Sequence, residues 1–167
     1  MIGGGGAGLA AAWNLAVDNL GKASELIVIE SGIVRYEQII RITSGWETLN
    51  NVTVIHSTLD AYIPNLKSDS SIGLIINASG LGKDRPCPQF DLSGITSKHF
   101  GYWDFNYRGN LELLQSFRDV EKVNDIRIYD GRKYFYCGWS YVMSHVAGVP
   151  WNEDMVMTFT RIAEKNN

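Results

Sequence analysis

Hydrophobic positions along the chain follow two patterns that alternate with each other. Short runs of consecutive apolar and β-branched residues are typical of strands buried on both faces of a sheet. Apolar residues three and four positions apart predict amphipathic helices. We expect strands at Leu26–Ile29, Val52–His56, Ile72–Ala78, Tyr102–Tyr107 and Ile126–Tyr129. We expect helices at about Gly6–Leu20, Val34–Leu49, Asn110–Val120, Lys133–Val146 and Glu153–Glu164, and a helical or irregular piece around Leu59–Leu66.

This alternation predicts the fold class, which is α/β. Strands that alternate with helices form an open, mostly parallel, doubly wound sheet with helices on both faces. A chain of 167 residues with 45% hydrophobic content can bury one substantial core. We therefore expect residues 1–167 to form a single domain.

Composition and charge exclude several classes of function. The 15 basic and 18 acidic residues give a net charge of -3, and the chain contains no basic block. This balance argues against nucleic acid or an anionic membrane as a partner. No stretch approaches the roughly 20 apolar residues of a membrane span, and no export signal is visible, so we expect a cytoplasmic protein.

The spacing of the cysteines and histidines along the sequence does not match that of a metal site or a nucleophilic triad. Cys87 and Cys137 are 50 residues apart and lack histidines at metal-ligand spacing. We expect two reduced thiols and no metal, with a reactive Cys137 as the alternative.

The glycine-rich opening of the chain carries the strongest signal of function. Gly3, Gly5 and Gly8 have the spacing of a turn that approaches a pyrophosphate, and Gly6 and Ala7 complete it. An apolar helix follows, whose first N–H groups would point at that anion. The opening predicts a Rossmann-type domain that binds a dinucleotide.

Glu30 indicates which dinucleotide this would be. It ends a strand 22 residues after Gly8, where an acceptor for a ribose hydroxyl is expected. A carboxylate there favours NAD over NADP, because it would repel a 2′-phosphate. The nearest cation in sequence, Arg35, falls in the next helix pattern. Only Met1 and Ile2 precede the turn, so we expect a truncated first strand.

Several short motifs resemble the nucleotide-binding domain of the shikimate/quinate dehydrogenase family. Its glycine turn, G-x-G-G-x-x-x-A, is matched from Gly3 to Ala10, and its N-A-T/S strand end is matched from Asn77 to Ser79. Its D-x-x-Y motif is matched from Asp104 to Tyr107 and its late glycine by Gly131. The resemblance implies cofactor contacts at Asn77, Ser79 and Gly131 and a substrate contact at Tyr107.

The resemblance also implies a reaction and a missing part. Family members transfer hydride from a ring hydroxyl to nicotinamide, and their catalytic Lys and Asp lie in a substrate domain that precedes the nucleotide domain. We expect that domain to be absent here, so that the chain is inactive alone and its catalytic residues are unknown. Lys83 and Asp84 are candidates for a proton relay beside the nicotinamide. The alternative is that they are solvated loop charges or form an ion pair with Arg85.

Two departures from the family pattern limit the expectation. Glu30-Ser31-Gly32 stands where members that prefer NADP have N-R-T/S, which agrees with NAD. Cys137-Gly138-Trp139 stands near the late glutamine that holds the substrate hydroxyls in shikimate enzymes, so shikimate itself is not the expected substrate. The alternatives are a non-catalytic nucleotide-binding or interaction module, which could form a homodimer, and an N-terminal fragment of an FAD-dependent oxidoreductase. The parallel sheet would place Gly3–Gly8, Glu30 and the loops after Ala78 and Tyr107 around one crevice.

Overall fold

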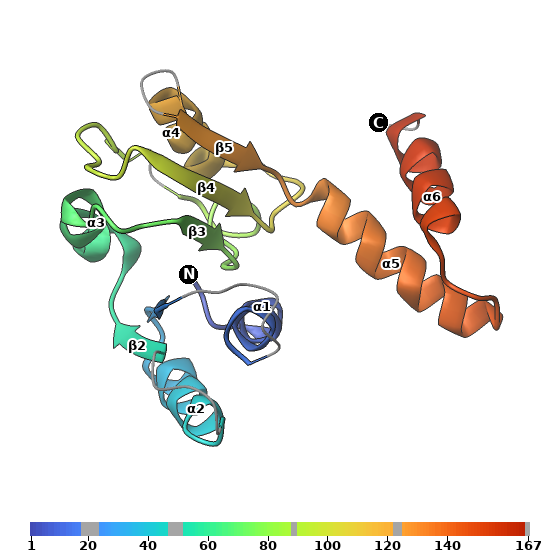
Figure 1. Cartoon of the computed structure of the whole chain (residues 1–167), viewed down its shortest axis with the longest axis horizontal. Coiled ribbons are helices and arrows are strands. Elements are labelled where there is room, and N and C mark those ends of the chain that lie inside the picture. Colours follow the sequence, from blue (N-terminus) through green and yellow to red (C-terminus); the bar gives the residue numbers. More distant parts are fainter. Residues whose placement is uncertain (18–23, 47–51, 88–89, 122–124, 166–167) are drawn as a thin grey trace.

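The computed structural model describes residues 1–17, 24–46, 52–87, 90–121 and 125–165, and it has an α/β fold (Figure 1). Strands and helices alternate along the chain, and two helices close it. The elements are α1 (Gly6–Ala16), β1 (Leu26–Glu30), α2 (Ile33–Thr43), β2 (Val52–His56), α3 (Leu59–Ser68), β3 (Leu74–Asn77), β4 (His99–Asp104), α4 (Glu112–Glu121), β5 (Asp125–Tyr129), α5 (Arg132–Ala147) and α6 (Glu153–Lys165).

All the described strand pairs are parallel. β1 pairs with β2, and β3, β4 and β5 pair in that order. Ile2 joins the two groups, because it bridges Ile29 of β1 and Asn77 of β3. The spatial order is therefore β2, β1, Ile2, β3, β4, β5, which is the Rossmann order with a very short first strand. The chain runs outward in opposite directions from Ile2, so the topological switch point lies at the glycine turn that follows it.

Helices cover both faces of the sheet, as the sequence predicts. On one face, Ala12 of α1 and Ile39 of α2 pack with Leu26 and Val28 of β1. On the other face, α3 and α4 contribute to a larger core that includes residues of β3, β4 and β5. Tyr102 and Phe117 stack in this core with their ring centroids 3.9 Å apart. The doubly wound prediction is confirmed.

Most element boundaries agree with the sequence analysis to within two residues, and β2 agrees fully. The second helix ends at Thr43, before the expected end at Leu49, which itself lies outside the described residues. The Thr43 hydroxyl donates to the Ile39 carbonyl, and the Ser44 hydroxyl donates to the Arg41 carbonyl. Such side-chain bonds compete with the helical pattern at a helix end. The first helix ends at Ala16 rather than at the expected Leu20, which lies outside the residues that the structure describes.

The position of β4 differs from the expectation at both ends, because this strand spans His99–Asp104 instead of the expected Tyr102–Tyr107. The Asp104 carboxylate accepts the Asn106 main-chain N–H at 2.9 Å, and this local turn ends the strand. The strand expected at Ile72–Ala78 is shorter in the structure, where β3 is limited to Leu74–Asn77. Because β4 ends at Asp104, Tyr107 lies in a loop.

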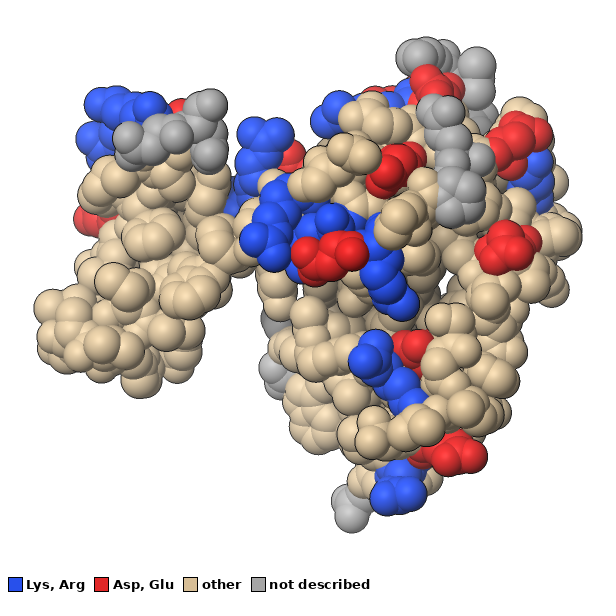
Figure 2. Space-filling model, turned by 180° about the vertical axis from the view of Figure 1, so that it is seen from behind, with Lys and Arg blue, Asp and Glu red and all other residues tan. Residues whose placement is uncertain are grey.

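Helices α5 and α6 form a hairpin that extends away from the sheet (Figure 1). Within the described helix α6, no residue is buried. The hairpin carries many exposed apolar side chains, and Figure 2 shows this lobe as mostly uncharged. The exposed apolar side chains of the hairpin include Trp139, Tyr141, Val142, Met143, Val146, Trp151, Met157 and Ile162. Among the described helices, none is long and apolar enough to span a bilayer.

Candidate functional site

The glycine turn, the end of β1 and the loop after β3 surround one small crevice at the carboxyl ends of the strands. Its volume is about 90 Å³. Four of the residues that the sequence predicts for cofactor binding line it, namely Gly3, Gly5, Glu30 and Ser79. The structure therefore brings together side chains and turns that are up to 76 residues apart in sequence, at the place where parallel α/β sheets bind ligands.

Two glycines hold the turn against the rest of the fold. Gly3 has a φ of +85°, and a Cβ on it would lie 2.8 Å from the Cα of Ser79. A Cβ on Gly8 would meet the carbonyl oxygen of Gly3. Only glycine permits these two backbone approaches, so both residues have a structural reason to be glycine.

Gly5 and Gly6 differ from the other glycines of the turn because they face open space. A Cβ on either would meet no atom within 4 Å. Helix α1 begins after Gly5 without a side-chain cap and without an acidic residue in its first turn. The first N–H groups of a helix lack intrahelical partners and carry partial positive charge. The main chain from Gly5 to Gly8 therefore offers an anion-binding surface with room above it.

Glu30 has a structural role that the sequence did not reveal. It is buried, and its two carboxylate oxygens accept main-chain N–H groups from Gly4 at 3.1 Å and Gly32 at 2.9 Å. These bonds join the glycine turn to the start of α2. Because each carboxylate oxygen can accept more than one hydrogen bond, the group can still receive a hydroxyl from the crevice.

Two arginines line the same crevice, and neither is expected there from the sequence. Arg35 belongs to α2, as predicted, but it lies in the crevice that contains Glu30. Arg85 reaches it from the loop after β3. Arg35 lies in the first turn of α2, shortly after the end of β1. No local signal in the sequence indicates that Arg85 reaches the crevice. The crevice thus contains one carboxylate and two guanidinium groups.

Asn77 lies beneath the crevice and is fully buried. Its amide nitrogen donates to both oxygens of Asp104 at 3.1 Å, and its amide oxygen accepts the Ser79 hydroxyl at 2.7 Å. Asp104 also accepts the Tyr102 hydroxyl at 2.8 Å. Burial raises the pKa of Asp104 and raises that of Tyr102 well above its ordinary value. Asn77 therefore positions Ser79 and does not itself line the crevice.

Lys83, Asp84 and Tyr107 form a separate cluster with Arg108. The Lys83 ammonium lies 3.2 Å from the Asp84 carboxylate and 5.7 Å from the centre of the Tyr107 ring. Arg108 lies 3.3 Å from the same carboxylate. The hydrogen bond from Lys83 is the main cause that lowers the pKa of Asp84. A carboxylate shifted in this direction is less suited to accept a proton near neutral pH. A relay through Lys83 and Asp84 remains a prediction.

Gly131 lies at the start of α5, against the end of β4. Its N–H donates to the Asn106 carbonyl at 3.0 Å, and a Cβ on it would meet the Phe105 carbonyl oxygen. Nearby, the ring of Tyr107 stacks on that of Phe135 with their centroids 4.0 Å apart. Neither Gly131 nor Tyr107 lines the small crevice. The nine predicted cofactor residues and Tyr107 therefore do not all lie at one site.

The two cysteines differ in their surroundings. Cys87 is buried, and burial together with the nearby carboxylates of Glu112 and Asp104 raises its pKa to about 11.

We expect a disulfide-exchange reagent at pH 8 to modify Cys137 of the folded protein at least tenfold faster than Cys87, because the thiolate is the reacting form. Mass spectrometry of the labelled peptides would measure this. Cys137→Ser should then remove the fast phase, and a fast phase that persists would contradict the assignment.

Among the described residues, no group of three or more His, Cys, Asp or Glu side chains could hold a metal ion.

Comparisons with known proteins give one structural match. No family model matches the sequence, and no curated protein matches it. The structure is similar to the crystal structure of shikimate 5-dehydrogenase from Thermus thermophilus in complex with shikimate, with a TM-score of 0.60 and 16% sequence identity. The match covers 97% of this chain and 52% of that one, so this chain spans about half the length of the solved protein. At this level of identity, the match establishes that the chain has a Rossmann-like α/β fold similar to one part of shikimate dehydrogenase.

Proposed function

We propose that the chain is the NAD-binding domain of an oxidoreductase similar to shikimate and quinate dehydrogenases. The observation that carries this proposal is the convergence of an uncapped helix N-terminus, the open Gly5 that precedes it and a buried acid on one crevice. The shared fold supports it, because members of the family that the motifs resemble transfer hydride to nicotinamide. Residues 1–167 would form this one domain.

The residues of the crevice fit a dinucleotide in distinct ways. The N–H groups at the start of α1 would bind the pyrophosphate, above Gly5 and Gly6, where a side chain would fill the space. Glu30, at the strand end, would accept hydroxyl groups of the adenosine ribose. Ser79, oriented by Asn77, would contribute a hydroxyl farther along the crevice. The bound nicotinamide would supply the hydride acceptor, while the protein positions it.

The proposal of NAD rather than NADP rests on the fixed position of Glu30. Two main-chain N–H groups hold its carboxylate at the end of β1. A 2′-phosphate placed there would be repelled. Arg35 and Arg85 are the groups that could instead attract such a phosphate, which makes NADP the second choice.

We propose that the substrate is a ring hydroxy acid and that catalysis needs a second domain. Among the described residues that line the crevice, neither Lys83 nor Asp84 is present, because both lie in the separate cluster with Tyr107. This chain alone would therefore bind cofactor without turnover. The exposed apolar face of the α5–α6 hairpin supports docking of another domain.

Calorimetric titration with NAD, NADP and FAD tests the cofactor. We expect NAD to bind, and Glu30→Gln to weaken NAD about tenfold while the affinity for NADP stays equal or rises. Glu37→Gln, on the exposed side of α2, is the matched control and should bind as the parent does. Arg35→Ala should weaken only NADP. Binding of FAD alone would contradict the proposal and favour a flavin protein.

A second candidate is a nucleotide-binding or interaction module without catalysis. The same hairpin favours it, because its exposed aromatic and aliphatic side chains could pair with another chain or with a second copy in a homodimer. Self-association that Trp139→Asp abolishes, combined with no binding of any dinucleotide, would favour this candidate over the dehydrogenase domain.

A further inference from the structure

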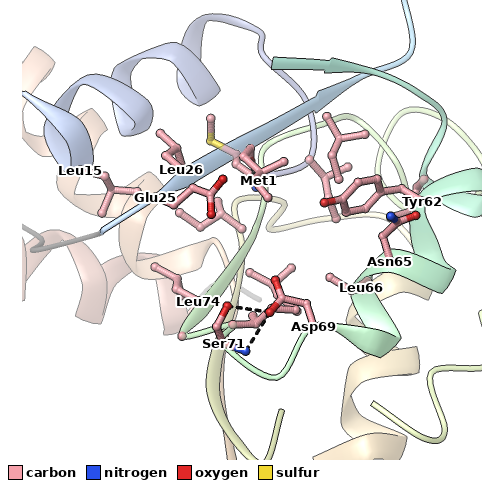
Figure 3. A pocket seen from close by; sticks show the side chains of 18 of the residues that line it. Met1, Leu15, Glu25, Leu26, Tyr62, Asn65, Leu66, Asp69, Ser71 and Leu74 are labelled. Carbon is pink, nitrogen blue, oxygen red and sulfur yellow. Dashed lines mark hydrogen bonds between the residues drawn. The ribbon is translucent and has the colours of Figure 1, made fainter. Parts of the chain in front are cut away.

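Strand β5 forms an edge of the described sheet. A cavity of about 440 Å³ lies between β1 and β3 beside Met1 (Figure 3), and a continuous hydrogen-bonded group of strands runs from β3 through β4 to β5. Within the described residues, β5 pairs with β4 on one side and with no strand on the other (Figure 1). An edge strand presents N–H and C=O groups that can pair with another strand.

The main-chain directions in β4 identify the residues of β5 that face this edge. The Gly101 N–H donates to the Gly73 carbonyl at 2.9 Å, which directs Gly101 toward β3. The next residue, Tyr102, is therefore directed toward β5, where its aligned partner is Ile128. In a parallel pair, such a residue bonds to the two residues that flank its aligned partner. Ile128 and, two positions before it, Ile126 thus direct their main-chain groups to the free edge.

The side chains of β5 alternate between an apolar face and a charged face. Ile126 is buried in the core to which α4 contributes, whereas Asp125 and Arg127 lie on the opposite face and are exposed. On β4, Asp125 is aligned with His99, whose ring nitrogen lies 3.1 Å from its carboxylate. Arg127 is aligned with Gly101, which has no side chain. β4 therefore supplies a directly opposite side chain for Asp125 but none for Arg127.

A second copy of the same strand supplies that side chain when the two edges pair antiparallel about Ile126. In this register the two Ile126 residues exchange their N–H and C=O groups across a two-fold axis, because both residues point out of the edge. Asp125 of each copy then lies opposite Arg127 of the other, on the same face and in a close pair. One two-fold axis thus generates two identical ion pairs.

Other antiparallel registers lack this complementarity. A two-fold axis at Arg127 would place the two guanidinium groups directly opposite each other, and like charges in that position are destabilising. An axis at Ile128 would set Arg127 opposite Tyr129, and Asp125 would face the turn that follows the partner strand. The charges of β5 therefore favour one register, and they are complementary to a second strand of the same sequence.

We propose that the free edge of β5 is a homodimer interface, in which two copies of this chain pair antiparallel about Ile126 with two Asp125–Arg127 ion pairs. The pairing joins the two sheets into one and places α4 of both copies on the same face. Strands of five residues bury a small area, so the dimer is weak, with a dissociation constant on the order of 0.1 mM. This interface involves neither the crevice nor the hairpin and goes beyond the proposed function.

Hydrogen exchange at two protein concentrations tests the edge without any substitution. Between roughly 0.02 and 1 mM protein, we expect exchange at the Ile126 amide to slow about threefold or more, because this N–H is bonded to a strand only in the dimer. Exchange at Arg127 and Tyr129 should not change, since alternation directs these amides to β4. Exchange at Ile126 that is independent of protein concentration would overturn the proposal.

Two charge-reversed variants test the register. Arg127→Asp creates two pairs of opposed carboxylates, and Asp125→Arg creates two pairs of opposed guanidinium groups. Each variant should weaken the dimer at least about tenfold in sedimentation equilibrium. An equimolar mixture of the two should associate again, because their heterodimer contains two opposite-charge pairs. Arg41→Asp and Glu37→Arg, which change exposed residues of α2, are the matched controls and should associate as the parent does.

Three outcomes would contradict the proposed interface. Association that Arg127→Asp leaves unchanged would place the dimer elsewhere on the surface, for example at the hairpin. Failure of the mixed variants to associate would exclude the pairing of Asp125 with Arg127. Stronger association of Arg127→Gln than of the parent would indicate a two-fold axis at Arg127. Titration of the same samples with NAD reports on the crevice separately.

Discussion

Replacing Asp104 by alanine is expected to lower the free energy of unfolding by on the order of 4 kcal/mol, because three buried donors lose their acceptor. These donors are the Asn77 amide, the Tyr102 hydroxyl and the Asn106 main-chain N–H. The loss corresponds to a fall in melting temperature of roughly 10 °C. Urea and thermal denaturation followed by circular dichroism would measure both quantities.

Two comparisons make this prediction specific. Asp104→Asn keeps the shape and one acceptor, so its loss should be smaller than that of alanine. Exposed Asp60→Ala should change the free energy by less than about 0.5 kcal/mol. A loss from Asp104→Ala no larger than that from Asp60→Ala would contradict the role of the network.

The same carboxyl group sets a direction for pH dependence. Burial raises the folded-state pKa of Asp104 above its ordinary value, so in the window between the unfolded and folded pKa values the folded protein binds more protons than the unfolded one. The contribution of this group to stability is present below the unfolded value and is lost as pH rises through the folded one. Asp104→Asn should therefore remove a fall in stability with rising pH, measured by urea titrations across that window.

Substitution of the glycines in the turn should separate folding from cofactor binding. Gly8→Ala places a methyl group against the Gly3 carbonyl oxygen, so the main chain must shift, at a cost of about 2 kcal/mol, and NAD binding should be lost. Gly5→Ala meets open space, so the stability should change by less than about 0.5 kcal/mol. The methyl would nevertheless enter the space that we assign to the pyrophosphate, and NAD affinity should fall at least tenfold.

Gly138→Ala in α5 is the control for both variants. It also meets open space, but it lies in a helix far from the turn, where alanine should raise the free energy of unfolding by about 0.5–1 kcal/mol without changing NAD affinity. Calorimetry and urea denaturation of the three variants provide the test. Unchanged NAD affinity in Gly5→Ala would place the pyrophosphate elsewhere.

The sequence predicted the fold class and the centre of the crevice because both depend on local patterns. Continuous apolar runs identified the parallel strands, and the spacing from Gly3 to Gly8 with Glu30 identified the residues that meet at the switch point. The rule that parallel sheets bind ligands at the carboxyl ends of strands then placed the loop that contains Ser79. These inferences needed no knowledge of distant contacts.

Other features depend on contacts that the sequence does not encode locally. The end of β4 is set by one hydrogen bond from Asn106 to Asp104, which apolar periodicity cannot detect. Arg85 reaches the crevice only because its loop folds back, with its N–H bonded to the Gly80 carbonyl. The side chain of Asn77 points to Asp104, 27 residues away, and away from the crevice. Sequence motifs named this residue but not the direction of its side chain.

The hairpin of α5 and α6 bears on how the chain unfolds. The buried side chains are concentrated in the sheet and the helices that cover it, whereas the described part of α6 contributes none and α5 contributes only Tyr136, Ser140 and Ser144. Elements with few buried contacts open at a lower free energy than the core. We therefore expect the hairpin to open at a lower free energy than the sheet with its covering helices.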